Sequence, residues 1–338
     1  MKVLFVSGKI GSAKMMLPVI KAIGEDIKCL MSQKSRELCR FNEIEYNDAD
    51  SMTDSEILEL VSTFAPDVIL TGTSAGLNVE KKIIEIGSQL HFKTVAFVNQ
   101  WSLYKERFYY MDKTYLPDYI FLIDEIMKKE MIKAGFDESL LVVTGNPFFD
   151  NLEKIPDGNK ILFISQRFRE IIDDNYPGYN EFEVLEDVIN VLTELNIKRL
   201  VVRPHPLSNR TKFDQIVQKY IGEVLVSLDT LSDINTVLAD SKLIIGMTSM
   251  VLFQAALGKK AVISYQPHVN PKKDLSILQK LGISSTVKTK EKLKQRIKNM
   301  LDGTEEFLVN PKLSEKYLRS DATEAVISLL HDVSEDSA

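Results

Sequence analysis

The residues best suited to chemistry lie in four short polar segments of the second half of the chain. Each segment directly follows an apolar run that predicts a buried parallel strand. They are Ser165, Gln166 and Arg167; Arg203 and His205; Asp229 and Thr230; and Thr248 and Ser249. The carboxyl ends of parallel strands lie at one edge of a sheet, so these side chains can converge there. Arginine offers a bidentate fork to a phosphate and histidine offers one N–H donor, which together favour an anionic, nucleotide-like ligand.

The segment 241–264 is the clearest candidate for the phosphate contact. Residues 243–245 predict a strand, and residues 250–257 have helical periodicity. Thr248 and Ser249 are expected to cap this helix, whose free N–H groups form an anion site suited to a diphosphate. Taken alone, the segment favours an ordinary capped crossover, but its place after a second polar strand end favours the ligand site.

This segment and its neighbours indicate which residues would bind such a ligand. Gly246 opens the turn, and Gly258 is expected in the left-handed conformation that often follows a helix. Gln254 lies one helical turn beyond the cap, on a face that could reach a sugar hydroxyl. We expect the nucleotide-like ligand to contact Gln166, Arg167, His205, Gly246, Thr248, Ser249, Met250 and Gln254.

Three loops follow predicted strands in the first half. A glycine loop at 8–14 lies between a strand at 3–7 and a helix at 15–23, and the segments 71–76 and 99–104 each follow another strand. Loops in these places commonly carry ligand contacts, although the tryptophan of the third loop is at least as typical of a packing residue. We expect a second ligand to contact Gly8, Lys9, Gly11, Ser12, Thr73, Ser74, Asn99, Gln100 and Trp101.

Strands alternate with helices along nearly the whole chain, which is typical of parallel sheets covered by helices on both faces. The polar segment 151–160 contains Pro156 and Gly158 and predicts a linker. The expected fold class is α/β, with two Rossmann-like domains facing across a cleft. Their expected bounds are 1–152 and 160–322, followed by a helix end and polar tail at 323–338. The last helix, predicted at 310–330, is long enough to pack back across the first domain.

The composition excludes several classes of protein. The 338 residues carry a formal net charge of −6 and have a pI of about 5.5. No basic stripe with interleaved aromatics indicates nucleic-acid binding. Two cysteines and four dispersed histidines predict no metal site. No signal peptide or membrane-spanning run is apparent, so we expect a cytoplasmic protein.

The chain resembles the GT-B glycosyltransferase superfamily. The run TGNPFFD at 144–150 is similar to the end of that superfamily's first domain, and RPHP at 203–206 resembles the HP motif of bacterial sialyl-, capsule and glycerophosphate transferases. The run from Thr248 to Lys259 is similar to a nucleotide-binding motif. The resemblance implies that His205 and Ser249 contact the donor phosphate, and that Gln254 stands where the superfamily often has a ribose-binding glutamate.

Two alternatives to a transferase are compatible with this fold. Non-hydrolysing UDP-N-acetylglucosamine 2-epimerases have a similar fold, but their acidic motifs are replaced here at 71–76, 98–102 and 165–170. Because proton abstraction needs a positioned base, epimerisation ranks second. A binding protein without catalysis ranks third, because its lobes would also close on a ligand.

The sequence therefore predicts metal-independent transfer of a sugar from a nucleotide-sugar donor, UDP-, CMP- or CDP-linked, to a glycan or lipid-linked acceptor, in surface polysaccharide synthesis. Asp48 and Asp50 have the spacing of a metal-binding aspartate pair of some glycosyltransferases, but their polar surroundings favour a solvated loop. The expected catalytic residues are His205, Arg203 and, as the nearest acid to the first-half loops, Glu106. Nucleic acid is not an expected partner, whereas a homodimer and peripheral contact with a membrane are compatible with this function.

Overall fold

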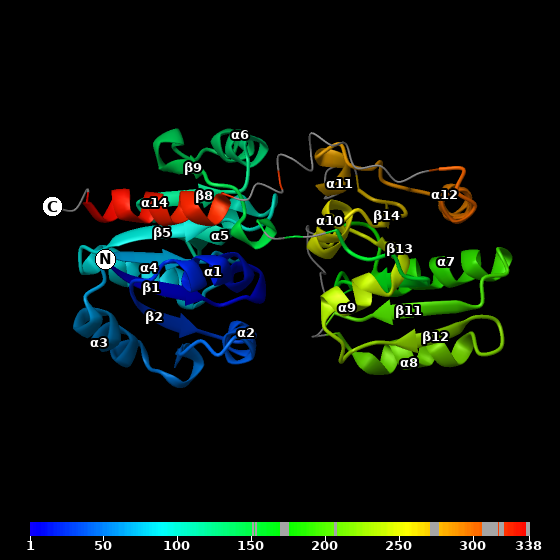
Figure 1. The fold of residues 1–338 in the computed structure, drawn as a ribbon, viewed down its shortest axis with the longest axis horizontal. Coiled ribbons are helices and arrows are strands. Elements are labelled where there is room, and N and C mark those ends of the chain that lie inside the picture. The colour runs from blue at the N-terminus through cyan, green and yellow to red at the C-terminus, as the bar shows by residue number, and fades with distance from the viewer. Residues whose placement is uncertain are drawn as a thin grey trace. The chain divides into compact units, whose positions relative to one another are not determined.

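The computed structural model describes residues 1–150, 152, 154–169, 176–205, 208–270, 277–305, 317 and 321–335. The chain divides into two compact units, Met1–Asn151 with Tyr317–Ala338, and Leu152–Lys316. Each unit is a parallel β-sheet with helices packed on it (Figure 1). The predicted α/β class with two Rossmann-like domains is confirmed.

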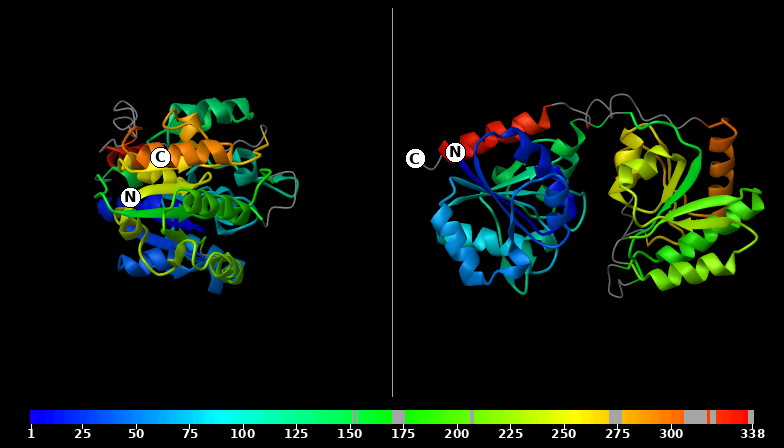
Figure 2. Two further views of the ribbon diagram at one scale, coloured as in Figure 1. Left: turned by 90° about the vertical axis from the view of Figure 1, so that its right-hand side faces the viewer. Right: turned by 60° about the horizontal axis from the view of Figure 1, so that its bottom comes forward.

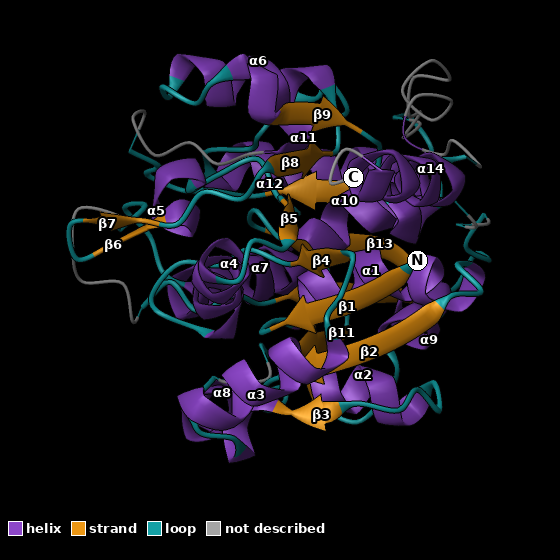
Figure 3. Cartoon of the chain, turned by 90° about the vertical axis from the view of Figure 1, so that its left-hand side faces the viewer, coloured by secondary structure: helices purple, strands orange, loops and turns teal. Residues whose placement is uncertain are grey.

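The first unit contains a seven-stranded parallel sheet in the order β3-β2-β1-β4-β5-β8-β9 (Figure 3). Its inner strands are buried because their residues are almost continuously apolar, as in β1, where only the first of six residues is exposed. The strands are β1 (Lys2–Ser7), β2 (Asp26–Met31), β3 (Asn47–Asp48), β4 (Val68–Thr71), β5 (Lys93–Phe97), β8 (Tyr119–Leu122) and β9 (Leu141–Val143).

Seven α-helices of the first unit lie within the described residues. They are α1 (Ile10–Ala22), α2 (Ser35–Phe41), α3 (Asp54–Phe64), α4 (Val79–Gln89), α5 (Tyr104–Phe108), α6 (Glu125–Lys133) and α14 (Ala322–Glu335). Short 3-10 turns lie at Ala49–Ser51, Glu138–Leu140 and Pro147–Phe149. Figure 2 shows α14, in red, beside α1, in blue, and the carboxylate of Asp150 accepts hydrogen bonds from Thr323 at the start of α14. The last helix thus belongs with the first unit, and much of the stretch 310–321 predicted to begin it lies outside the described residues.

The second unit contains a five-stranded parallel sheet in the order β12-β11-β10-β13-β14. Its strands are β10 (Lys160–Ile164), β11 (Arg199–Arg203), β12 (Leu225–Leu228), β13 (Ser241–Gly246) and β14 (Ala261–Ser264). Its described helices are α7 (Glu181–Glu194), α8 (Arg210–Lys219), α9 (Ile234–Ala239), α10 (Met250–Leu257), α11 (Ile277–Lys280) and α12 (Lys290–Leu301). The core joins the inner faces of these strands to α7, α8 and α12.

The predicted glycine loop at 8–14 is wrong, because α1 begins at Ile10. Only Gly8 and Lys9 lie in the turn, and Gly11 and Ser12 form the first helical turn. Gly11, in the first turn of α1, allows close packing rather than loop flexibility. A Cβ on Gly11 would lie 2.4 Å from the Nδ2 atom of Asn99.

The predicted role of Gly258 is also wrong. Its φ is −72°, and the left-handed residue after α10 is Lys259, with a φ of 63°. Gly258 instead allows close packing, since a Cβ there would lie 2.5 Å from the Cδ1 atom of Ile155.

A short helix and a hairpin after β5 were not predicted. Helix α5 is followed by the two-stranded hairpin of β6 (Tyr109–Tyr110) and β7 (Lys113–Thr114), which stands away from the main sheet (Figure 3). Among the described residues, no helix is both long and apolar enough to cross a bilayer.

Candidate functional site

The strands of the second unit end level with one another. Ile164 at the end of β10 lies opposite Arg203 of β11 and Gly246 of β13, and Gly246 lies opposite Ser264 of β14. The loops that follow these strands therefore begin at one edge of the sheet. A Cβ on Gly246 would lie 3.0 Å from the carbonyl oxygen of Ile164, so the strand ends approach closely here.

Gln166 and Thr248 join two of these loops directly. The Oε1 atom of Gln166 accepts a hydrogen bond of 2.8 Å from the backbone N–H of Thr248, and its Nε2 atom lies 3.0 Å from the hydroxyl oxygen of Thr248. Both residues are half-buried. Gln166 thus fixes the shape of the turn that leads into α10.

Ser249 is the N-cap of α10, and its hydroxyl accepts a hydrogen bond from the N–H of Val251 at 3.2 Å. Thr248 precedes the cap, and Met250 is the first helical residue; all three are half-buried. A capped helix N-terminus still presents N–H groups and a partial positive charge, which suit an anion.

Arg203 ends β11 and forms an ion pair with Asp229, whose Oδ1 atom lies 2.9 Å from its Nη1 atom. Burial alone would raise the pKa of Asp229, but hydrogen bonds from Ser232 and Leu231 and the charge of Arg203 lower it below its ordinary value. Asp229 therefore holds the guanidinium at the edge in its charged form. His205 follows two residues later and is half-buried.

Two other residues predicted to bind the donor are Arg167 and Gln254, and only Arg167 lies in a loop at this edge. Arg167 is half-buried in the loop after β10. Gln254 is only 4% exposed, and its Nε2 atom donates to the Oδ1 atom of Asn235 in α9 at 2.9 Å. The observed contact of Gln254 thus joins α10 to α9.

Sequence reasoning missed a buried polar chain beneath the same edge. Tyr179 donates to the Oε1 atom of Gln266 at 3.1 Å, Gln266 donates to Ser264 at 3.1 Å, and Ser264 donates to the carbonyl of Met247 at 2.6 Å. A neighbouring carboxylate, that of Glu181, accepts from the N–H groups that follow Arg167. No local signal identifies these residues, because each bond joins segments far apart in sequence or depends on burial.

The carboxyl edge of the first unit brings together most of the residues that were predicted to contact the second ligand, which is the acceptor if the protein is a transferase. Gly72, directly after β4, packs so closely that a Cβ would lie 2.5 Å from Ser12 Oγ and 2.6 Å from Glu80 Oε1. The Ser12 hydroxyl is fully buried and has no hydrogen-bond partner among the described residues. Gly11 meets Asn99 in the same place.

Arg107 of α5 links the loop after β4 to the loop after β5. Its side chain is buried, and its Nη1 atom donates to the carbonyl of Thr73 at 2.8 Å and to the Oδ1 atom of Asn99 at 3.0 Å. Its Nε atom donates to the carbonyl of Ser102 at 3.1 Å. Burial lowers the pKa of Arg107 to about 10, so it remains charged at neutral pH.

Two further ionisable groups are buried at this edge. Lys81 donates to the carbonyls of Ser74, Gly76 and Glu106, and burial lowers its pKa to about 8. Glu80 accepts from the N–H of Gly8 at 3.0 Å and from the hydroxyl of Ser74 at 2.5 Å, and burial raises its pKa. Together with Arg107, these two side chains therefore place two cations and one carboxylate in the buried part of this edge.

The remaining first-unit candidates make other contacts. Lys9 and Gln100 are exposed, and Lys9 donates to Gln33. Trp101 is buried, and its Nε1 atom donates to Asp124 at 3.0 Å. Glu106 has an exposed side chain, and its backbone carbonyl contacts Lys81.

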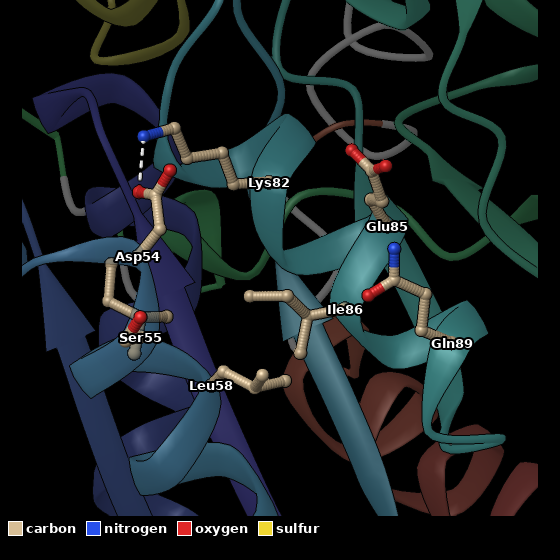
Figure 4. Close-up of a pocket in the computed structure, with 8 residues that line it drawn as sticks. Asp54, Ser55, Leu58, Lys82, Glu85, Ile86 and Gln89 are labelled. Carbon is tan, nitrogen blue, oxygen red and sulfur yellow. Dashed lines mark hydrogen bonds and ion pairs between the residues drawn. The ribbon is translucent and has the colours of Figure 1, made fainter.

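One surface hollow and one pair of aspartates in the first unit are each lined by an ion pair. A hollow of about 270 Å³ lies between α3 and α4, where Lys82 and Asp54 form an ion pair of 2.6 Å (Figure 4). Within the part of the chain that the structure describes, no group of three acids, histidines or cysteines could hold a metal. Asp48 and Asp50 both pair with Arg36, at 2.6 and 3.1 Å.

One protein-family model matches part of this chain. A family model for alpha-2,8-polysialyltransferase (POLYST) matches residues 101–266, which include β11, Arg203, His205 and all of α10. None of the curated proteins matches the sequence.

Many solved structures are similar in fold. UDP-GlcNAc 2-epimerase from Neisseria meningitidis, solved bound to UDP-GlcNAc, has 14% identity and a TM-score of 0.69, covering 98% of this chain and 100% of its own. MurG of Acinetobacter baumannii has 10% identity and a TM-score of 0.56, covering 98% and 99%. The lipopolysaccharide outer core galactosyltransferase WaaB has 12% identity and a TM-score of 0.56, covering 97% and 100%.

These findings confirm the resemblance on which the sequence interpretation was based. The whole chain, rather than one of its units, is similar to proteins built from two Rossmann-like domains. The polysialyltransferase match and the glycosyltransferases among the similar structures support the interpretation of this chain as a glycosyltransferase. The chain has the fold of the GT-B superfamily.

Proposed function

We propose that this protein transfers a sugar from a nucleotide-sugar donor to a glycan or lipid-linked acceptor. One observation carries the proposal: Arg203, His205 and the N-terminus of α10 lie in loops at one edge of the second sheet, inside the region matched by the polysialyltransferase model. The second unit would bind the donor and the first unit the acceptor. A cytoplasmic location and a role in surface polysaccharide synthesis complete the proposal.

The family match favours a sialic-acid-type sugar linked to CMP as the first donor to test. UDP-linked sugars come second, because the Neisseria meningitidis epimerase of similar fold was solved with UDP-GlcNAc. Both donors present phosphate oxygens to the protein, which is the chemistry that a helix N-terminus and an arginine recognise.

The chemistry asked of this edge is stabilisation of a leaving phosphate. Negative charge builds on the phosphate as its bond to the sugar breaks, so fixed donors and positive charge lower the barrier. The guanidinium of Arg203, an N–H of His205 and the first turn of α10 would supply both, and we therefore propose that no metal is required.

Epimerisation is the second candidate because the epimerase structures have a similar fold. Abstraction of a sugar proton needs a positioned base. The match to the polysialyltransferase model favours transfer over epimerisation.

The donor site is tested by nucleotide binding to single variants. Ser249→Ala and His205→Ala should each weaken binding of CMP, UDP or their sugars roughly 10- to 100-fold, because a hydrogen bond to a charged group is worth about 1.5–3 kcal/mol. The measurement is a thermal-shift titration, since a ligand at one hundred times its Kd adds about 2.7 kcal/mol of stability.

Thr53→Ala is the matched control for loss of a helix cap. Thr53 caps α3 in the first unit, where its hydroxyl accepts from the N–H of Glu56 at 3.3 Å. It should lose stability but keep nucleotide affinity. The donor site proposed here would be refuted if both second-unit variants bound nucleotide as tightly as the wild type, or if the wild type bound none of the nucleotides.

A further inference from the structure

Glu80 differs from the other buried carboxylates of the described residues in what it binds. Asp124 and Glu181 accept hydrogen bonds from backbone N–H groups and, for Asp124, from buried aromatic side chains. Glu80 is 1% exposed, yet one of its oxygens binds the hydroxyl of Ser74, which is half-buried in the loop after β4. The carboxylate is thus one hydrogen bond away from a group with access to solvent.

The cationic neighbours of Glu80 are engaged elsewhere. Lys81 directs its ammonium to three backbone carbonyls, and Arg107 directs its guanidinium to Thr73, Asn99 and Ser102. The observed hydrogen bonds of Glu80 come instead from the N–H of Gly8 and the hydroxyl of Ser74. A simple structural ion pair therefore does not explain the burial of this carboxylate.

The hydrogen bonds of Ser74 have a fixed direction. Glu80 is held to Gly8 through Oε1 and has Oε2 2.5 Å from Ser74 Oγ. The same Oγ accepts from Asn78 Nδ2 at 2.9 Å. A hydroxyl has one proton to donate and two lone pairs. With the proton given to Glu80 and one lone pair taken by Asn78, Ser74 has one acceptor position left.

We propose that Glu80 receives, through Ser74, the proton that the acceptor hydroxyl loses during sugar transfer. The acceptor O–H would donate to the open lone pair of Ser74. As the acceptor oxygen bonds to the anomeric carbon and the carbon–phosphate-oxygen bond breaks, its proton moves to Ser74 Oγ and the proton of Ser74 moves to Glu80 Oε2. The bonding pair leaves with the nucleotide phosphate, so charge and atoms balance. Ser74 touches the acceptor, and Glu80 acts only through it.

This inference rests on the proposed transferase function and supplies an acceptor for the proton of the acceptor hydroxyl. Burial raises the pKa of Glu80 and so makes its ionised form a better proton acceptor than an exposed carboxylate. The charges facing it are those of Lys81 on its own helix and Arg107 on α5, both of which oppose this rise without cancelling it.

The kinetic test compares Glu80→Gln, Ser74→Ala and Ser74→Thr with the wild type over a range of pH. Glu80→Gln should lower kcat at least about 100-fold and remove the acid limb of the pH–rate profile, because general-base assistance typically contributes 10²–10⁴-fold. Ser74→Ala should lower kcat and Ser74→Thr should restore part of it. Glu59→Gln, an exposed glutamate on α3 in the same unit, should match the wild type.

Stability against pH separates this role from a structural one. The pKa of Glu80 is higher in the folded protein than in the unfolded chain. The protonated carboxyl therefore contributes its full stability below the unfolded pKa of about 4.3, and this contribution is lost as the pH rises through the folded pKa. Glu80→Gln should remove this loss and be at least as stable as the wild type at pH 8. Chemical denaturation of both proteins at several pH values measures the difference.

The outcomes are distinct. A wild type that transfers sugar while Glu80→Gln keeps its rate and acid limb overturns the role of Glu80 and leaves the proposed function standing. A Glu80→Gln protein that binds nucleotide poorly or unfolds more easily at pH 8 assigns Glu80 a structural role and also overturns the inference. A wild type that transfers no sugar from any nucleotide donor overturns the proposed function and this inference with it.

Discussion

Replacing Arg107 by alanine should lower the free energy of unfolding by about 3–5 kcal/mol. The guanidinium is 3% exposed and supplies protons to Thr73, Asn99 and Ser102. The Thr73 carbonyl is buried and the other two oxygens are half-buried; a buried oxygen that loses its donor costs about 1–3 kcal/mol, and truncation of the buried arginine also leaves a cavity. Urea denaturation followed by circular dichroism measures the change.

Two further variants show whether the hydrogen-bonding fork of Arg107 is the cause. Lys105→Ala removes an exposed cation from the same short helix and should change stability by no more than about 0.5 kcal/mol. Arg107→Lys keeps the charge but not the planar fork, so its stability should lie between those of the wild type and the alanine variant. A loss of less than about 1 kcal/mol in Arg107→Ala would show that the two loops are held by other contacts.

Gly72→Ala should be the most damaging single methyl addition at the first unit's candidate site. The new Cβ would lie 2.4 Å from the Cβ of Ser12 and 2.6 Å from Oε1 of Glu80. Overpacking of this kind typically costs about 1–3 kcal/mol. Because relief of the clash must move Glu80 or α1, we also expect sugar transfer to fall roughly 10-fold or more, since catalytic groups act only when held within a fraction of an ångström.

Gly8→Ala is the matched control for this substitution. Gly8 contacts the same glutamate, but a Cβ there would lie 3.5 Å from its Cδ atom, which is an ordinary contact. Unfolding and transfer assays on the two alanine variants should therefore differ, with Gly8→Ala much the more stable. Equal stability of the two would mean that the packing around Gly72 yields more easily than its distances indicate.

The sequence indicated the sheets and the second unit's edge well, for a physical reason. Runs such as 243–245 and 3–6 are continuously apolar because parallel strands are buried on both faces, and polar residues directly after them must lie at the carboxyl edge. The approximate positions of the strands and helices of both units could be predicted in this way. So could the placement of Gln166, Arg203 and Ser249 in neighbouring loops.

Glu80 and Arg107 could not be found by the same reasoning. A glutamate in the first turn of a helix is typically an exposed charge that favours the helix dipole, and α5 has the highly charged sequence YKERF. Their burial depends on partners far along the chain, such as Gly8, 72 residues before Glu80, and Thr73, 34 residues before Arg107. Charge and periodicity alone do not reveal such contacts.

The central claim is best tested by incubating the wild-type protein with CMP- and UDP-linked sugars and oligosaccharide acceptors in the presence of EDTA. NMR of the products and release of free nucleotide should be followed together. We predict a new glycosidic linkage on the acceptor with equimolar release of nucleotide. A sugar inverted at C2 and still linked to its nucleotide, or no turnover with any pair, would contradict the proposed transfer.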